Sequence, residues 1–104
     1  MGDQEVRLTQ PTLKVLKLFV SAPREARSGA EISRAVNVGS GTLYPMLARL
    51  EAAGWLTSAW EAVEPREIGR PRRRLYRLSG VGYRNAHAAL ADLQVAPGEL
   101  AWKF

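Results

Sequence analysis

Arginines gather in one short stretch of this chain, and guanidinium groups are well suited to binding phosphate. They are Arg66, Arg70, Arg72, Arg73, Arg74 and Arg77. A guanidinium keeps its charge at physiological pH, and it can fork onto a phosphate or onto guanine O6 and N7. Such a run is common in solvated loops, but here it surrounds a Gly-Arg-Pro sequence at positions 69–71 between two strand patterns. This arrangement favours a basic surface that binds a polyanion.

Catalytic chemistry finds no support in the sequence. No nucleophile lies near a partner base, no glycine loop is suited to cradling phosphate, and no ligand spacing suits a metal. The chain has no cysteine and one histidine, His87. We therefore expect a protein that is not an enzyme and that holds no metal and no cofactor. A small-molecule effector would have no signature in this sequence.

The overall charge agrees with the arginine cluster. The 104 residues carry a formal net charge of +5 with a pI near 10.2, which favours nucleic acid or an acidic membrane surface as the partner. No apolar run approaches the length of a membrane span, and the polar N-terminus lacks the apolar region of a signal peptide. We expect a single-domain cytoplasmic protein that does not bind membranes.

The element that would present these groups is a helix expected at residues 40–54. Ser40 suits its N-cap, and Gly54 suits its end because glycine adopts the left-handed conformation without steric cost. One face is apolar at helical spacing and needs a core to pack against. It comprises Leu43, Met46, Leu47 and Leu50.

The opposite face of this helix carries small side chains and one long cation. Small side chains allow close approach to the DNA major groove, where Arg49 could fork onto guanine; a phosphate contact or a pair with Glu51 are its alternatives. Tyr44, on the flank, would pack under the neighbouring hairpin or hydrogen-bond a phosphate. An ordinary amphipathic helix with a bland outer face is the alternative interpretation. The residues expected to contact DNA are Ser40, Thr42, Tyr44, Pro45, Arg49, Arg70, Arg72 and Arg73.

Two helices precede this one, and together they predict a helix-turn-helix. Residues 8–22 form a helix with an apolar stripe on two sides. Ser28 and Glu31 form a capping box that opens a short helix ending near Asn37. A tight glycine turn then joins this short helix to the helix at 40–54, although any helical hairpin would show the same loop length.

Alternating polar and apolar residues after these helices predict a β-hairpin. The strands are expected at residues 55–62 and 73–78, joined by a Pro- and Gly-containing loop at 63–72 with a basic tip. Trp60 and Tyr76 are expected to be core aromatics rather than base-stacking side chains. A hairpin directly after a helix-turn-helix is a wing, so we expect a mainly α fold with a small β-hairpin, a winged helix-turn-helix.

A last helix, capped by Ser79, is expected from about residue 80 to residue 95. The chain then divides into a DNA-binding part at residues 1–79 and a C-terminal dimerisation helix and tail at 80–104, within the same compact unit. The tail aromatic Trp102 is expected to cover the core or a partner rather than to line a ligand site.

Surplus apolar surface on the first and last helices predicts a homodimer. A chain this small cannot bury a helix that is apolar on two sides, and the last helix has no later helix to cover it. The residues expected at the dimer interface are Leu13, Leu16, Val20, Tyr83, Ala86, His87, Leu90 and Leu93.

Two motifs give the chain a resemblance to the PadR family of bacterial winged-helix transcription regulators. The first reads GTLYPML at residues 41–47, with RLE at 49–51 and GWL at 54–56. The second reads GRPRRRLYRLS at residues 69–79, followed by Gly82. The resemblance covers roughly residues 10–95, and the pairing of the two motifs in this order makes it specific.

The resemblance implies a homodimer that binds a palindromic operator, usually as a repressor, through an interface that combines the first helix with C-terminal helices. This chain has one C-terminal helix and a short tail, so it looks like the short form of the family. That departure puts in doubt an effector pocket built by further C-terminal helices. Some short-form relatives bind flat aromatic compounds between their subunits.

Three functions are open from the residues alone. The first is a sequence-specific, DNA-binding repressor of transcription, and the second is a winged-helix module for protein assembly with the basic hairpin as a scaffold loop. The third is an RNA-binding winged helix. The basic hairpin favours nucleic acid over assembly, and the small helix face favours duplex DNA because the RNA major groove is too narrow for side chains to read.

Overall fold

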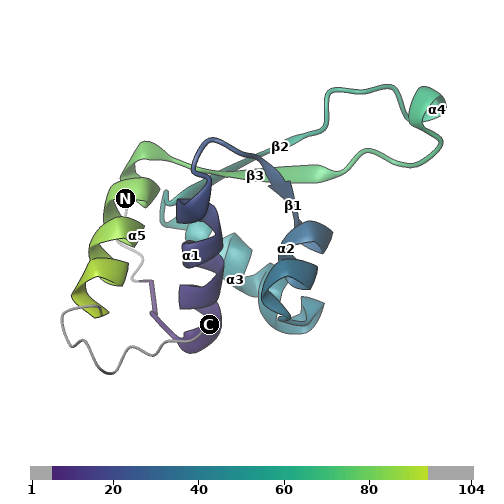
Figure 1. Cartoon of the computed structure of the whole chain (residues 1–104). Coiled ribbons are helices and arrows are strands. Elements are labelled where there is room, and N and C mark those ends of the chain that lie inside the picture. Colours follow the sequence, from purple (N-terminus) through teal and green to yellow (C-terminus); the bar gives the residue numbers. More distant parts are fainter. Residues whose placement is uncertain (1–5, 94–104) are drawn as a thin grey trace.

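The computed structural model describes residues 6–93, whose helices lie beneath a small sheet that extends into a long hairpin (Figure 1). The elements in chain order are α1 (Gln10–Ser21), β1 (Arg27–Ser28), α2 (Gly29–Val36), α3 (Ser40–Ala52), β2 (Leu56–Trp60), α4 (Pro65–Ile68), β3 (Arg74–Leu78) and α5 (Gly80–Leu93). The predicted fold, mainly α with a winged helix-turn-helix, is confirmed. The predicted end of the last helix near residue 95 and the tail with Trp102 lie outside the described residues.

The sheet has three antiparallel strands in the order β1-β3-β2. β2 and β3 form the predicted hairpin, with Ser58 opposite Tyr76. β1 pairs with the other edge of β3, where Arg27 also lies opposite Tyr76. The sequence did not predict β1, because two residues are too few to show the alternation of a strand.

α1 lies between α5 and α2 and packs against both (Figure 1). The hydrophobic core comprises Val15, Leu16, Phe19, Ile32, Val38, Leu43, Met46, Leu47, Leu50, Leu56 and Ala86. All of the residues predicted for the apolar face of α3 belong to this core. Burial of each such large side chain contributes about 1.5–3 kcal/mol, so the inner face of α3 holds this helix in one orientation.

Side-chain caps fix the starts of three helices. Thr9 caps α1, which therefore begins two residues after its predicted start. Ser28 and Glu31 form the predicted capping box of α2: the Ser28 N–H donates to Glu31 Oε1 at 2.8 Å, and the Glu31 N–H donates to Ser28 Oγ at 3.2 Å. The predicted cap of α5 is also confirmed, because Ser79 Oγ accepts from the Gly82 N–H at 2.8 Å.

The start of α3 differs from the prediction, because Gly39 and not Ser40 is the N-cap. The Gly39 carbonyl accepts the N–H of Thr42 at 3.1 Å and the N–H of Leu43 at 2.9 Å. This makes Ser40 the first helical residue, and no side-chain cap bond forms at this end. Ser40 is exposed, and its hydroxyl does not serve as a cap.

The end of α3 follows the prediction and leads to a tight junction with α5. Gly54 has a φ of +84°, and the Trp55 N–H donates to the Leu50 carbonyl at 2.9 Å. Ser79 Oγ donates to the Gly54 carbonyl at 2.6 Å, which ties the start of α5 to the end of α3. Gly82 lies against the Trp55 backbone, where a Cβ would overlap the Trp55 carbonyl oxygen. This junction therefore requires glycine at position 82.

Gly82→Ala should destabilise the fold, because the added methyl group meets backbone atoms that cannot move without shifting α5. Overpacking of this kind costs about 1–3 kcal/mol. Gly80→Ala is the matched control: a Cβ there has only the end of the Arg84 side chain at 4.0 Å, so stability should stay the same or rise slightly. Thermal unfolding followed by circular dichroism measures the difference, and equal midpoints for the two variants would contradict the tight contact.

Candidate nucleic-acid interface

The outer face of α3 is exposed and consists mostly of small residues. Opposite the buried face lie Gly41, Pro45, Ala48 and Ala52. A helix turns by about 100° per residue, so Tyr44 and Arg49 lie about 140° apart around the axis. They border the outer face from its two sides rather than standing at its centre. Ser40 and Thr42, which the sequence also predicts to contact DNA, are exposed on the same helix.

Tyr44 closes one side of this face, where α3 meets α2 and β3. Its side chain is 46% exposed, and its ring and hydroxyl lie over Gly29 at the start of α2, leaving no room there for a Cβ. The ring borders a recess of about 170 Å³ that is also lined by Arg73, Arg74 and Tyr76. Tyr76 packs against the core, as predicted. Tyr44 thus contacts neighbouring elements and still reaches a recess lined by arginines.

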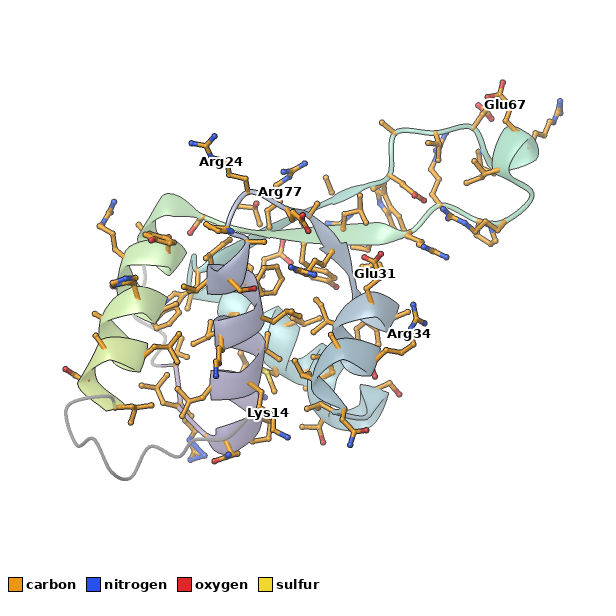
Figure 2. The ribbon with its side chains drawn as sticks, in the orientation of Figure 1. Lys14, Arg24, Glu31, Arg34, Glu67 and Arg77 are labelled. Atoms are coloured by element: carbon orange, nitrogen blue, oxygen red, sulfur yellow. The ribbon has the colours of Figure 1, made fainter. Side chains whose placement is uncertain are left out.

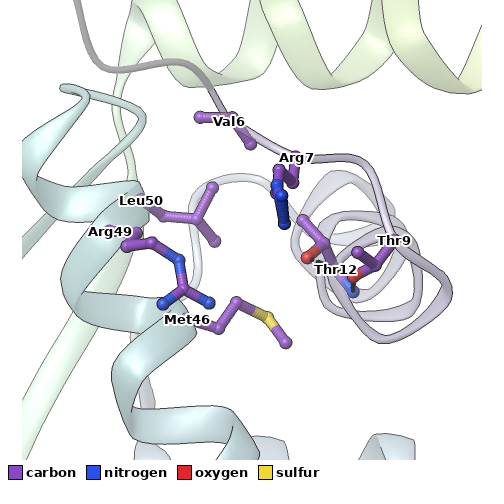
Figure 3. Close-up of a pocket in the computed structure, with 7 residues that line it drawn as sticks. All are labelled: Val6, Arg7, Thr9, Thr12, Met46, Arg49 and Leu50. Atoms are coloured by element: carbon purple, nitrogen blue, oxygen red, sulfur yellow. Dashed lines mark hydrogen bonds between the residues drawn. The ribbon is translucent and has the colours of Figure 1, made fainter.

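Arg49 borders a different recess, on the other side of α3 (Figure 3). Its volume is about 430 Å³, and its lining residues are Val6, Arg7, Thr9, Thr12, Met46, Arg49 and Leu50. The alternative pairing of Arg49 with Glu51 does not form, because side chains two residues apart on a helix do not face each other. Glu51 Oε2 instead accepts a hydrogen bond from Ser58 Oγ at 2.8 Å. Arg49 is therefore directed to the flank of α3 that faces the start of α1.

Residues 61–73, here called the wing loop, join β2 to β3 and contain α4 where the sequence predicts only loop. Arg70 Nη1 donates to Glu61 Oε1 at 2.8 Å, and Arg70 Nη2 donates to Glu61 Oε2 at 3.0 Å. The Arg73 backbone N–H adds a hydrogen bond to Glu61 Oε1 at 3.0 Å. These contacts, first among them the Arg70 side chain, lower the pKa of Glu61 to about 2. The charged carboxylate therefore closes the base of the wing loop.

The predicted DNA-binding arginines of the wing loop differ in how they are held. Arg70 is paired with Glu61, and Arg72 Nε donates to the Val63 carbonyl at 2.7 Å. Arg72 Nη2 also lies 3.9 Å from a carboxylate oxygen of Glu64. Arg73 is exposed, and within residues 6–93 only its backbone forms a hydrogen bond. Its guanidinium is therefore the most available of the three for a ligand.

A chain of contacts links the hairpin to α3. Arg74 Nε donates to Ser58 Oγ at 3.0 Å, and Ser58 Oγ donates to Glu51 Oε2 at 2.8 Å. The Arg74 guanidinium also lies over the Trp60 ring, 5.0 Å from its centroid. Trp60 is 61% exposed, so the prediction that it is a core aromatic is wrong. Trp60 is the last residue of β2, at the end that leads into the part of the hairpin extending past the helices (Figure 1). The alternation pattern alone therefore predicted burial of the Trp60 ring wrongly.

The residues predicted for a dimer interface fall into two groups. Leu16 and Ala86 are fully buried in the chain's own core and Leu13 is 7% exposed, so these three offer little surface to a second copy. The others are exposed or half-buried; they are Val20, Tyr83, His87, Leu90 and Leu93. Val20, His87 and Leu90 line a groove of about 300 Å³ between α1 and α5. The Tyr83 and His87 ring centroids lie 5.6 Å apart.

Charged side chains project from several elements of the molecule (Figure 2). Among residues 6–93, no group of three His, Cys, Asp or Glu side chains is arranged to hold a metal ion. No helix in the same range is long and apolar enough to cross a membrane. The interface brings guanidinium and hydroxyl groups together around an exposed helix, and this chemistry suits binding of a polyanion.

Several residues that shape this interface are not predicted by the sequence patterns: Arg7, Gly29, Ser58 and Glu61. Glu61 had a usable signal, because it lies across the predicted hairpin from an arginine-rich arm and opposite charges pair between strands. The other three act through contacts between elements that are distant in sequence. Periodicity and turn motifs do not reveal such contacts.

The pKa of Glu61 predicts how the wing loop responds to acid. Its folded-state pKa of about 2 lies below the ordinary 4.5, so its contacts stabilise the closed loop above pH 4.5 and are lost as the pH falls through 2. The Arg73 amide signal in ¹⁵N-correlated NMR spectra should titrate with a midpoint near 2, and Glu61→Gln should abolish this transition. Glu67→Gln, at an exposed position of the same loop, is the control. A midpoint near 4.5 would show that Glu61 does not close the loop in solution.

The PadR-like family of transcriptional regulators matches residues 26–88 of the chain. Among solved structures, a PadR-like transcription factor from Bacteroides fragilis is 24% identical, with a TM-score of 0.64 over 78% of this chain and 77% of that one. A PadR-family transcriptional regulator from Eggerthella lenta is 25% identical, with a TM-score of 0.62 over 79% of this chain and 73% of that one. The S. aureus MepR–DNA complex is 17% identical, with a TM-score of 0.64 over 80% of this chain and 62% of that one.

The chain spans about half the length of other solved structures that it matches, including AbfR of Staphylococcus epidermidis. No curated protein sequence matches it. The family match covers more than half of the chain and includes α2, α3, the hairpin and most of α5. It confirms the resemblance carried by the two sequence motifs, and it indicates a regulator rather than an enzyme. The chain belongs to the PadR-like family of transcriptional regulators.

Proposed function

We propose that the chain binds duplex DNA in a sequence-specific manner and, as a homodimer, represses transcription from a palindromic operator. The observation that carries this proposal is the small, exposed outer face of α3, which is bordered on both sides by recesses that contain arginine. The PadR-like family match supports a role in transcription. A MepR structure that contains DNA shares the fold, which supports DNA as the ligand.

α3 is the proposed recognition helix. Its inner residues are held in the core, so its outer face can meet base edges without disturbing the fold. Small side chains let the helix approach the floor of the major groove, and the methyl groups of Thr42 and Ala48 suit contact with thymine methyl groups. Duplex RNA offers no equivalent contact, because its deep and narrow major groove excludes side chains.

The wing loop would contact the phosphate backbone or the adjacent minor groove. Arg73 is exposed and borders the recess beside Tyr44, so the two side chains can serve the same stretch of backbone. Arg70 and Arg72 shape the loop through partners within it. Arg73 is therefore the proposed directed contact of the wing loop, at a phosphate or in a narrow A·T minor groove that attracts arginine.

A two-fold homodimer would place two copies of α3 in successive major grooves, about 34 Å apart, on a palindromic site. Residues 1–79 would form the DNA-binding part, and residues 80–104 together with α1 would supply the contact between copies. The apolar residues that remain accessible on α1 and α5 support this interface, since an exposed apolar patch marks a contact surface. Such a repressor would act in the cytoplasm, where bacterial DNA lies.

Binding should be selective for duplex DNA and should depend on Arg73. In gel-shift titrations, the wild-type chain should bind duplex DNA more tightly than duplex RNA of the same sequence. Arg73→Ala should weaken binding to every DNA duplex and should reduce the slope of log K against log salt by about 0.9, because one phosphate contact releases counterions in that proportion. Arg84→Ala, which removes an exposed arginine from α5, is the matched control.

Each alternative outcome of this titration is informative. Equal affinity for DNA and RNA would favour an RNA-binding winged helix. Binding to neither nucleic acid would favour a protein-assembly module. An unchanged salt slope in Arg73→Ala, with wild-type binding intact, would remove the wing loop from the DNA interface.

Leu90→Asp combined with Leu93→Asp should give a monomer that binds its operator much more weakly, because two carboxylates would be buried in the proposed interface. The control is Asn85→Asp with Ala88→Asp, two exposed positions of the same helix that point away from Leu90. Sedimentation velocity at micromolar concentration measures the oligomeric state, and circular dichroism checks that each variant is folded. A wild-type monomer that protects a single half-site would rule out the homodimer.

A further inference from the structure

The recess beside Arg49 is formed where α3 meets the start of α1 (Figure 3). Arg49 reaches it from α3, and Arg7 reaches it from the segment that leads into α1. Both arginines are exposed, and within residues 6–93 no hydrogen bond or ion pair engages either guanidinium. Two like charges thus face the same space, and no acidic side chain of residues 6–93 pairs with either of them.

The remaining walls of the recess are fixed in place. Met46 and Leu50 are 3% and 1% exposed and belong to the core. Thr9 and Thr12 form another wall, where their hydroxyl oxygens lie 2.9 Å apart in a hydrogen bond. One hydroxyl donates to the other, so one proton of the pair is left to donate elsewhere.

This set of groups is suited to an anion with several acceptor oxygens. The recess offers two guanidinium groups and a hydroxyl donor, and none of the lining residues that the structure describes is acidic. Its volume of about 430 Å³ leaves room for one phosphate group with water around it. Guanidinium binds phosphate with shorter and stronger hydrogen bonds than neutral donors form.

The position of the recess identifies the source of that phosphate. The major groove of B-DNA is about 12 Å wide and is bordered by one sugar–phosphate backbone on each side. α3 has a recess on each flank: the one beside Tyr44 contains Arg73 and Arg74, and the one beside Arg49 contains Arg7. A helix in the groove would therefore meet one backbone with each recess.

We propose that the recess between α1 and α3 binds a backbone phosphate of the DNA, with Arg7 and Arg49 contacting the same phosphate. This inference rests on the proposed DNA-binding function and adds Arg7 and the start of α1 to the interface. It also assigns Arg49 to the backbone instead of to a guanine base. Arg49 then contributes affinity and register on the duplex, and it does not contribute sequence preference.

The test uses the full chain with Arg7→Ala, Arg49→Ala and the double variant, each titrated onto a panel of DNA duplexes of different sequence. The double variant should bind every duplex more weakly, and its slope of log K against log salt should be smaller by about 0.9. Between 50 and 200 mM salt, the double variant should therefore lose about threefold less affinity than the wild type loses. Because both arginines contact one phosphate, the two single losses should be non-additive. Arg49→Lys keeps the charge and should retain the salt slope.

Arg84→Ala again serves as the control, since it removes the same charge from α5. Loss of binding to one duplex only in Arg49→Ala would mean a base contact and would overturn the inference. Fully additive losses, or variants that behave like Arg84→Ala, would overturn it as well. If the wild-type chain binds no duplex at all, the proposed function itself fails, so the two failures are distinguishable.

A competition arm separates the DNA backbone from a free anion. Inorganic phosphate is exchanged for chloride at constant ionic strength while the wild type and the double variant are bound to duplex DNA. The proposal expects the two proteins to respond alike, because the occupied recess contains a backbone phosphate. Selective displacement of the wild type by inorganic phosphate, with unchanged DNA affinity of the double variant in chloride, would make a free anion the occupant and overturn the assignment.

Discussion

α3 is anchored by burial of its inner face, and the rest of the interface takes its position from that contact. Leu43, Met46, Leu47 and Leu50 lie in the core with α1 and α2 around them. A helix held by one face presents the opposite face at a fixed angle. The turn at Gly54 then sends the chain into the hairpin, and the hydrogen bond from Ser79 to Gly54 returns it to the same point. The helix α3 and the hairpin therefore share a single anchor.

Fewer arginines are free to bind a ligand than the number of arginines in the sequence suggests. Arg70 and Arg72 are engaged by oxygen atoms within the wing loop, and Arg74 is engaged by Ser58 and the Trp60 ring. These side chains give the hairpin its shape, and they link it to α3 through Ser58 and Glu51. Near α3, the guanidinium groups of Arg7, Arg49 and Arg73 have no hydrogen-bond partner within residues 6–93, and they lie on the two flanks of this helix. A groove-binding helix needs charge at those flanks, because the backbones of the duplex run there.

The sequence predicts the elements whose signals are local. The apolar face of α3, the capping box at Ser28, the cap at Ser79 and the hairpin all follow from periodicity or from short motifs. β1 was missed because it is two residues long and exists only through its pairing with β3. The expected cap at Ser40 fails because the Gly39 carbonyl already accepts the first helical N–H groups.

The site was harder to predict than the fold. The sequence does not distinguish an exposed arginine from one that is paired within the protein. Arg70 and Arg73 were therefore grouped together, although Glu61 binds the side chain of Arg70 and only the backbone of Arg73. Trp60 shares the alternation of a core strand, but it lies at the end of β2 that leads away from the helices (Figure 1). Arg7 and Arg49 are brought to one recess by packing between α1 and α3. Contacts of this kind follow from tertiary structure and not from any local pattern.

The central claim is that both flanks of α3 and the wing loop face the duplex, and one measurement tests it directly. Backbone amide signals of the ¹⁵N-labelled chain are followed while duplex DNA is added in low salt. The largest shifts should fall on residues 40–52, on the wing loop and on residues 7–9, while the exposed residues of α5 change little. Shifts concentrated on α5, with α3 and the wing loop unaffected, would contradict the proposed interface.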